Sequence, residues 1–274
     1  MSNLYLLVNG NVKCPITFTT FSDGAENCNI GAIYSDSVVL VVDVEDCTRD
    51  IMRMMLVKEA LEASGIEAVS LTINYFPNAR CDRRFGTGEG FPLKVFAKMV
   101  NSCNFDSVYI TDPHSDVTPA LIDRVQVITQ NNSFRNLRHK IRDGIGDNYI
   151  ICAPDLGATK KAEIIANGMD KPLIQAFKHR DIKTGKITST SVNLPIKYAN
   201  RDVLIVDDIC DGGATFSYLA TELLKLGAKS VSLYITHGIF AKGLQPLTNL
   251  NKIYVSHLNE TYINRRDIEK FNER

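Results

Sequence analysis

Three carboxylates, two glycines and a hydroxyl are concentrated between Asp207 and Thr215. The apolar residues 203–206 just before them predict a strand buried on both faces, and leucines at helical spacing after them predict a helix. The acids at the end of this strand would lie at the carboxyl edge of a parallel sheet, where open α/β folds bind ligands. The glycine-rich turn lets the backbone approach an anion at a helix N-terminus. The segment therefore predicts a phosphate site beside a pair of acids.

The kind of phosphate follows from what this turn lacks. It has neither the Lys that follows the glycines of a Walker P-loop nor the G-x-G-x-x-G spacing of a dinucleotide fold. A phosphomonoester suits it better than a triphosphate or a pyrophosphate bridge, and two adjacent acids suit vicinal hydroxyls. Together these features describe a 5-phosphoribosyl group. The alternative is an ordinary turn between a strand and a helix, with solvated acids.

Two segments of the first half place polar residues at the ends of expected strands. The segment 75–84 concentrates arginines after a strand and offers aromatic faces for stacking, or it is a solvated turn. His114 follows another strand tip, next to an Asp, and is either a metal or phosphate contact or a plain polar loop residue. Neither segment decides a function alone.

The second half contains two further candidates. Asp155 repeats the order strand, acid, glycine, helix and predicts a second turn directed at an anion, with Lys160 and Lys161 as contacts or as surface charges. Lys178 and Arg180 lie at the base of a hydrophilic stretch between two strands. This stretch is either a mobile catalytic lid or a simple exposed hairpin.

Length and composition limit the class of protein. The chain has 274 residues, which at about 150 residues per domain predicts two domains, and we place them at 1–140 and 141–274. The formal net charge is zero and the basic residues are scattered, so we expect no nucleic-acid partner. No apolar run is long enough to span a bilayer, so we expect no membrane partner and a cytoplasmic protein. Seven cysteines without a C-x-x-C pair indicate reduced core thiols.

The order of elements predicts the fold class. A strand at 38–43, a helix capped by Thr48 and a strand at 69–75 alternate as β, α, β, which predicts a parallel sheet. Residues 115–148 read as helical, and a second series of strands and helices begins at Tyr149. The likeness of 108–114 to 233–238 suggests that the two halves share one α/β plan.

Taken together, these patterns resemble the ribose-phosphate pyrophosphokinase (phosphoribosyl diphosphate synthetase) family. The resemblance extends from about Phe21 to Phe240 and is strongest in the glycine-rich segment and in Tyr75–Arg80, Asp112–His114, Ala153–Gly157 and Thr236–Phe240. It implies two phosphoribosyltransferase-like domains, each a mostly parallel β-sheet flanked by helices. The implied reaction transfers the diphosphoryl group of ATP to O1 of ribose 5-phosphate and leaves AMP. The first domain would be the ATP side and the second the ribose 5-phosphate side.

The resemblance also implies a role for each matching residue. Lys178 and Arg180 would be catalytic. ATP would be bound by Phe21, Asp23, Glu26, Arg80, Asp82 and His114. Ribose 5-phosphate would be bound by Asp207, Asp208, Asp211, Gly212, Gly213, Ala214 and Thr215. Magnesium would be contacted by His114, Asp155 and Asp207.

The implied cofactor is Mg²⁺, and the implied partners are ATP, ribose 5-phosphate and further copies of the chain, as a dimer or a hexamer of dimers. Diphosphoryl transfer needs charge neutralisation and in-line placement more than covalent help, which suits this set of residues. The chain departs from the family pattern at its N-terminus, at Cys81 and Pro113, and in its short C-terminus. These departures concern the adenine contacts and the assembly, and they leave the ribose-phosphate loop intact.

Two other classes of function fit parts of the sequence. A phosphoribosyltransferase would consume the diphosphate, but one domain would suffice for it, and Arg80, His114 and Asp155 would have no role. A non-catalytic regulatory relative would bind synthetase subunits, and we would expect it to have lost the lid or the metal contacts. Product analysis with free bases, and turnover by the purified chain alone, distinguish these classes.

Overall fold

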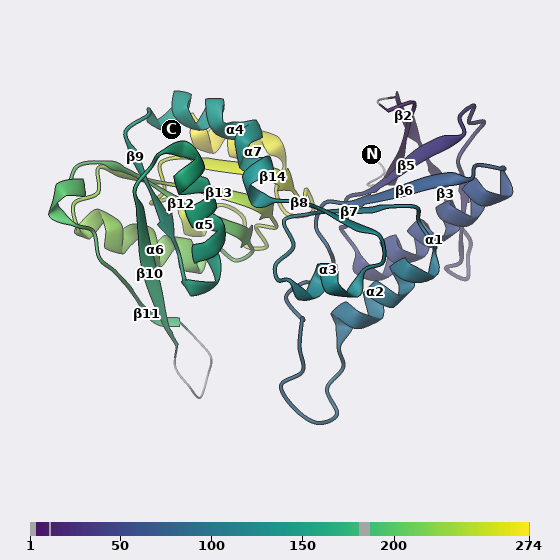
Figure 1. The fold of residues 1–274 in the computed structure, drawn as a ribbon, viewed down its shortest axis with the longest axis horizontal. Coiled ribbons are helices and arrows are strands. Elements are labelled where there is room, and N and C mark those ends of the chain that lie inside the picture. The colour runs from purple at the N-terminus through teal and green to yellow at the C-terminus, as the bar shows by residue number, and fades with distance from the viewer. Residues whose placement is uncertain (1–3, 11, 181–186, 274) are drawn as a thin grey trace. The chain divides into compact units, whose positions relative to one another are not determined.

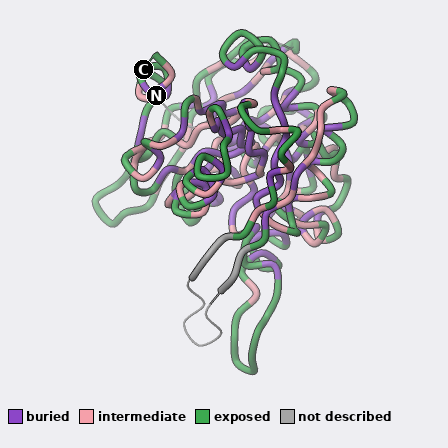
Figure 2. The backbone as a smooth tube through the Cα atoms, turned by 90° about the vertical axis from the view of Figure 1, so that its left-hand side faces the viewer, coloured by how far each residue is buried: buried purple, intermediate pink, exposed green. Residues whose placement is uncertain are grey.

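The chain forms two compact units, residues 1–129 and 130–274 (Figure 1). The computed structural model describes residues 4–10, 12–180 and 187–273, and at 178–180 and 187–190 it describes the backbone alone. Figure 2 shows buried residues gathered in the interior and exposed residues along the outlying loops. Each unit is an α/β fold with its own sheet, which confirms the predicted fold class.

The first unit is built on a six-stranded sheet with the order β2-β1-β5-β6-β7-β8. Neighbours from β5 to β8 are parallel, whereas β1 pairs antiparallel with both β2 and β5. The strands are β1 (Leu4–Val8), β2 (Val12–Pro15), β5 (Ser37–Val42), β6 (Ala68–Ile73), β7 (Val108–Thr111) and β8 (Val125–Ile128). The helices are α1 (Cys47–Ala63), α2 (Pro92–Ser102) and α3 (Val117–Leu121).

A single hydrophobic core holds this unit together. Alternate residues of the strands, such as Leu40 and Leu71, pack against Met54 and Leu61 of α1 and Phe96 of α2. A separate hairpin, β3 (Thr17–Thr20) and β4 (Glu26–Asn29), packs against α1. The long segment between β6 and α2 extends away from this core (Figure 1), and its residues 83–90 are exposed.

The second unit repeats the plan with the order β11-β10-β9-β12-β13-β14. All neighbours are parallel except the hairpin of β10 and β11. The strands are β9 (Tyr149–Ala153), β10 (Leu173–Arg180), β11 (Ile187–Val192), β12 (Asp202–Cys210), β13 (Ser230–Gly238) and β14 (Ile253–Leu258). The helices are α4 (Gln130–Ile145), α5 (Leu156–Met169), α6 (Ala214–Lys225) and α7 (Arg265–Asn272), with short 3-10 turns Ile196–Tyr198 and Gln245–Leu247.

The central strand of this sheet is buried on both faces. Val203 and Ile205 belong to a core shared with α6 and α7, whereas Leu204 and Val206 belong to a second core shared with α4 and α5. All four side chains are fully buried. The continuous apolar run predicted a strand buried on both faces. This prediction is confirmed, since each of the four side chains packs into one of the two cores.

Three local predictions were wrong. Residues 125–128 form a strand within the region read as helical, because pairing with β7 outweighs the weak local pattern of four residues. Asp46, not Thr48, caps α1. The cysteines are all free, as expected, but Cys47 and Cys81 are exposed and only Cys152 and Cys210 are buried.

None of the helices in the described parts of the chain combines the length and the apolar character that a membrane span requires. It stays a prediction that residues 1–140 form the ATP side and residues 141–274 the ribose 5-phosphate side.

Candidate functional site

The glycine-rich loop joins β12 to α6 and lies at the carboxyl edge of the second sheet. The sequence predicted a strand that ends in Asp207 and Asp208, and the strand in fact continues two residues farther, to Cys210. Gly213 begins α6 with φ of +76°, and a Cβ there would lie 3.0 Å from Cδ2 of Leu247. Only glycine satisfies both demands without strain. No side chain among the described residues caps this helix.

The paired acids are held by different partners. The Asp208 amide donates to Oδ1 of Asp207 at 2.9 Å. Oδ2 of Asp208 lies 3.7 Å from Nζ of Lys161, which extends from α5. Asp208 is 8% exposed, and a carboxylate buried to that degree is stabilised by an opposite charge. Lys161, whose role the sequence left open, therefore belongs to the site.

The strand register brings further polar residues to the same edge. Cys152 of β9 pairs with Ile205 of β12, so Asp155, three residues farther along, lies beside the paired acids. Asp155 caps α5, and its Oδ1 accepts the amide of Ala158 at 3.0 Å. On the other side of β12, His237 of β13 pairs with Ile209. The sheet order thus gathers residues that are far apart in the sequence.

The predicted catalytic cations lie on the same sheet. Lys178 and Arg180 are in β10, which is parallel to β9 and forms an antiparallel hairpin with β11. The side chains of both residues, and the stretch 181–186 that was expected to form a lid, lie outside the described residues. Their roles stay predictions.

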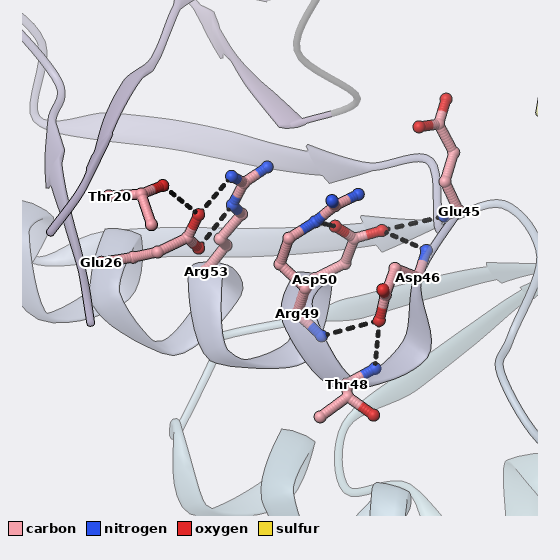
Figure 3. Close-up of polar contacts among 8 residues, drawn as sticks. All are labelled: Thr20, Glu26, Glu45, Asp46, Thr48, Arg49, Asp50 and Arg53. Carbon is pink, nitrogen blue, oxygen red and sulfur yellow. Dashed lines mark hydrogen bonds and ion pairs between the residues drawn. The ribbon is translucent and has the colours of Figure 1, made fainter. Parts of the chain in front are cut away.

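In the first unit, the hairpin of β3 and β4 holds the first three predicted ATP residues. Phe21, which is 55% exposed, lies in the turn at the hairpin's tip, where its amide donates to the carbonyl of Ala25 at 2.8 Å. Asp23 accepts the Ala25 amide at 3.0 Å and so stabilises the turn. Glu26 is instead paired with Arg53 of α1 and accepts the hydroxyl of Thr20 (Figure 3). Its carboxylate ties the hairpin to the helix, and Arg53 holds its pKa below the usual range.

Asp82 is a predicted ATP residue of the first unit, and its carboxylate is held by its neighbour in the chain. Nε of Arg83 donates to Oδ1 of Asp82 at 2.8 Å. The Arg83 hydrogen bond lowers the pKa of Asp82 most, with smaller contributions from Ser115 and from the charge of His114. Arg80 is exposed in the same loop. The ATP-binding roles of Arg80, Asp82 and His114 stay predictions.

A polar chain at the carboxyl edge of the first sheet was not predicted from the sequence. Nδ2 of Asn74 donates to Oδ1 of Asp43 at 2.7 Å, and the Thr111 hydroxyl donates to Oδ1 of Asn74 at 3.3 Å. Burial raises the pKa of Asp43. Asp43 and Asn74 directly follow an apolar strand, and Thr111 ends the next one, so inspection of each strand end would have found this chain.

The candidate metal ligands do not form a closed cage. Across the described ranges, no three His, Cys, Asp or Glu side chains are grouped closely enough to hold a metal ion by themselves. His114 belongs to the first unit, and Asp155 and Asp207 belong to the second. A metal ion at these residues would need other ligands, such as water or substrate oxygens.

Comparison with known proteins gives the family. The model of the phosphoribosyl transferase domain matches residues 126–261, which include most of the second unit. The ribose-phosphate pyrophosphokinase of Pyrococcus furiosus is 30% identical over 238 residues, covering 84% of this chain and 81% of the relative. The chain belongs to the ribose-phosphate pyrophosphokinase family.

Other relatives in this family extend the match. The ribose-phosphate pyrophosphokinase of Saccharolobus solfataricus is 27% identical over 254 residues, covering 90% of this chain and 85% of the relative. The crystal structure of the phosphoribosylpyrophosphate synthetase from Mycobacterium smegmatis matches with a TM-score of 0.74 at 18% identity, over 89% of this chain and 80% of that one. The pyrophosphokinase fold thus covers both units, and the resemblance found in the sequence is confirmed.

Proposed function

We propose that this chain transfers the diphosphoryl group of ATP to O1 of ribose 5-phosphate, forming 5-phosphoribosyl 1-diphosphate and AMP. The observation that carries the proposal is the β12–α6 loop, where paired acids precede a glycine turn and a helix whose N-terminus has no side-chain cap among the described residues. The relatives named ribose-phosphate pyrophosphokinase support the same reaction.

The second unit would bind ribose 5-phosphate. The 5-phosphate would be held by the backbone of Asp211–Thr215, since amides at a helix N-terminus favour an anion. Asp207 and Asp208 would accept hydrogen bonds from the ribose hydroxyls. The Lys161 ammonium would offset the negative charge of Asp208 and help to orient its carboxylate.

The first unit would bind ATP through Arg80, Asp82 and His114. Phe21 and Asp23 would contribute to the adenine pocket of a neighbouring copy, which makes a homo-oligomer part of the proposal. Glu26 would serve this pocket through its ion pair with Arg53, which holds the hairpin that presents Phe21. The Lys178 and Arg180 side chains would stabilise the transferring group when both substrates are bound.

The residues present fit Mg²⁺. Carboxylate oxygens are its preferred protein ligands, and an ion that arrives with a nucleotide and keeps several waters needs only one or two of them. The absence of a cage of three among the described residues agrees with this mode. In the first unit His114 would contact magnesium, and in the second unit Asp155 and Asp207 would do so. Magnesium would neutralise charge on the ATP phosphates. Seven free thiols support a reducing compartment such as the cytoplasm.

Product analysis tests the proposal. We expect purified chain, ATP, ribose 5-phosphate and MgCl₂ to yield equal amounts of AMP and phosphoribosyl diphosphate, and no AMP without ribose 5-phosphate or with excess chelator. Nucleotide formation from phosphoribosyl diphosphate and free bases would instead indicate a phosphoribosyltransferase. A chain that makes no AMP under any of these conditions would refute the diphosphokinase assignment.

A further inference from the structure

The segment after β13 is bonded to the start of the phosphate loop. The amides of Ile239 and Phe240 both donate to the carbonyl of Cys210, at 2.8 and 3.1 Å. The Gly243 amide closes a turn by donating to the carbonyl of Phe240 at 2.8 Å. Leu247, farther along, packs against Gly213. Residues 239–247, which we call the brace, are therefore fixed against the loop by backbone bonds and by packing.

Lys242 of the brace lies across Gly212. A Cβ built on Gly212 would lie 3.6 Å from Cδ and 3.7 Å from Cε of Lys242, which is ordinary van der Waals contact. The lysine stem therefore runs along the backbone of the loop, and its ammonium lies one bond beyond Cε. Lys242 is exposed, and in the described portion of the chain it forms no ion pair.

The glycine-rich loop contains more negative than positive charge. The stretch Asp207–Thr215 contains three carboxylates and no basic residue. Lys161 lies 3.7 Å from Asp208 and offsets one of these negative charges. A phosphate monoester would add close to two more, and like charges in one site repel. Amide dipoles at the helix N-terminus supply roughly half a positive charge, and the proposed Mg²⁺ at Asp207 would serve the ATP phosphates, so the 5-phosphate has no full positive charge of its own.

We propose that Lys242 is a binding residue of the ribose 5-phosphate site, where its ammonium contacts the 5-phosphate from the side of Gly212. This inference rests on the proposed function, and it adds to that site a residue from outside the glycine-rich motif. The backbone bonds from Cys210 place the brace in advance, so little freedom is lost when the ammonium meets the phosphate. A charge-assisted contact of this kind strengthens binding of the phosphorylated sugar over the free sugar.

The test compares two lysines of the second unit. Lys242→Met keeps an unbranched stem over Gly212 and removes the charge. Lys225→Met is the matched control: Lys225 is exposed and pairs with Glu222 at 2.8 Å. It lies at the far end of α6, about 16 Å along the helix at 1.5 Å per residue. We expect Lys242→Met to raise KM for ribose 5-phosphate about tenfold, with kcat and KM for ATP changed less than about twofold. Lys242→Arg should restore most of the affinity.

Isothermal titration separates this inference from the proposed function. Wild-type chain should bind ribose 5-phosphate more tightly than ribose, and Lys242→Met should lose most of that difference while Lys225→Met keeps it. An unchanged affinity for ribose 5-phosphate in Lys242→Met, with AMP still formed, would overturn the role of Lys242 alone. A wild-type chain that binds ribose 5-phosphate but forms no AMP would overturn the reaction, and the titration would still decide Lys242. If wild type does not bind ribose 5-phosphate, both fall.

Discussion

Two helices that follow parallel strands, α1 in the first unit and α6 in the second, begin in opposite ways. At α1, Oδ1 of Asp46 accepts the amides of Thr48 and Arg49, each at 3.0 Å, and the buried Asp50 accepts two more amides of the preceding turn (Figure 3). At α6, Gly213 takes the cap position, and a glycine has no side chain to accept the first amides.

This difference shows what would suit a strand-helix junction to a phosphate. At α1, Asp46 accepts amides of the helix itself, and the Arg49 amide is the main cause that lowers the pKa of Asp46. At α6, the glycine at the cap position brings no carboxylate to the first amides, and the acids of β12 contact a neighbouring amide and Lys161. The glycine turn separates the carboxylates from the helix that they would otherwise cap.

We expect the largest effect on activity from a change at Asp207, one of the paired acids of β12. Asp207→Asn keeps the shape of the side chain and removes its charge. We expect kcat/KM for the proposed reaction to fall about 100-fold or more, because substrate placement is lost, with little change in thermal unfolding. AMP release and calorimetry measure the two quantities. Near wild-type turnover in this variant would show that the acids of β12 are no more functional than those of α1.

The next comparison uses two glycines with the same φ of +76°, Gly213 at the start of α6 and Gly65 just after α1. A Cβ at Gly65 meets nothing within 4 Å, whereas one at Gly213 meets Leu247 at 3.0 Å. Gly65→Ala should cost about 1–2 kcal/mol of stability through backbone strain alone. Gly213→Ala should cost more and should also raise KM for ribose 5-phosphate. Urea unfolding and steady-state kinetics check this, and equal effects of the two changes would contradict it.

Two stacked histidines of the second sheet make the stability of the folded chain depend on pH. His257 of β14 stacks on His237 of β13 with ring centroids 5.9 Å apart. Burial first, and then the charge of Arg265, lower the pKa of His257 to about 4 from 6.5. Between these pH values the unfolded chain binds a proton that the folded chain does not, so the free energy of unfolding falls as the pH falls.

His257→Gln should remove this acid sensitivity, which amounts to roughly 2 kcal/mol between pH 7 and pH 4.5. Urea unfolding at the two pH values measures it. His139 is exposed on α4, and His139→Gln is the matched control for the loss of one imidazole. A wild-type free energy of unfolding that stays level over this range would contradict the assignment.

We expect the smallest effect at α1, whose N-terminus is capped by Asp46. Asp46→Ala removes the acceptor for two amides of α1, so the midpoint of thermal unfolding should fall by a few degrees. Ribose 5-phosphate affinity should stay unchanged, since the change lies in the other unit. A loss of that affinity equal to the loss in Asp207→Asn would remove the distinction between the two junctions.

Much of this molecule follows from short stretches of sequence. The strand Tyr149–Ala153 and the glycine turn before α6 were predicted from local patterns, because apolar runs, paired acids and glycines act within a few residues. The cap of α1 was misassigned because Asp46 and Thr48 are both good cap residues, and only the backbone path shows which one precedes the helix. The strand 125–128 was missed because its partner, not its own pattern, makes it a strand.

The sequence by itself determined the order of strand, acids, glycines and helix, and with it the kind of ligand that the second unit suits. Only the tertiary structure decided which charges meet, because Lys161 reaches Asp208 through the packing of α5 on the sheet, and Lys242 reaches Gly212 through the bonds that the brace makes to Cys210. Residues so far apart in the chain have no local pattern that links them, and their distances are set by strand order and packing.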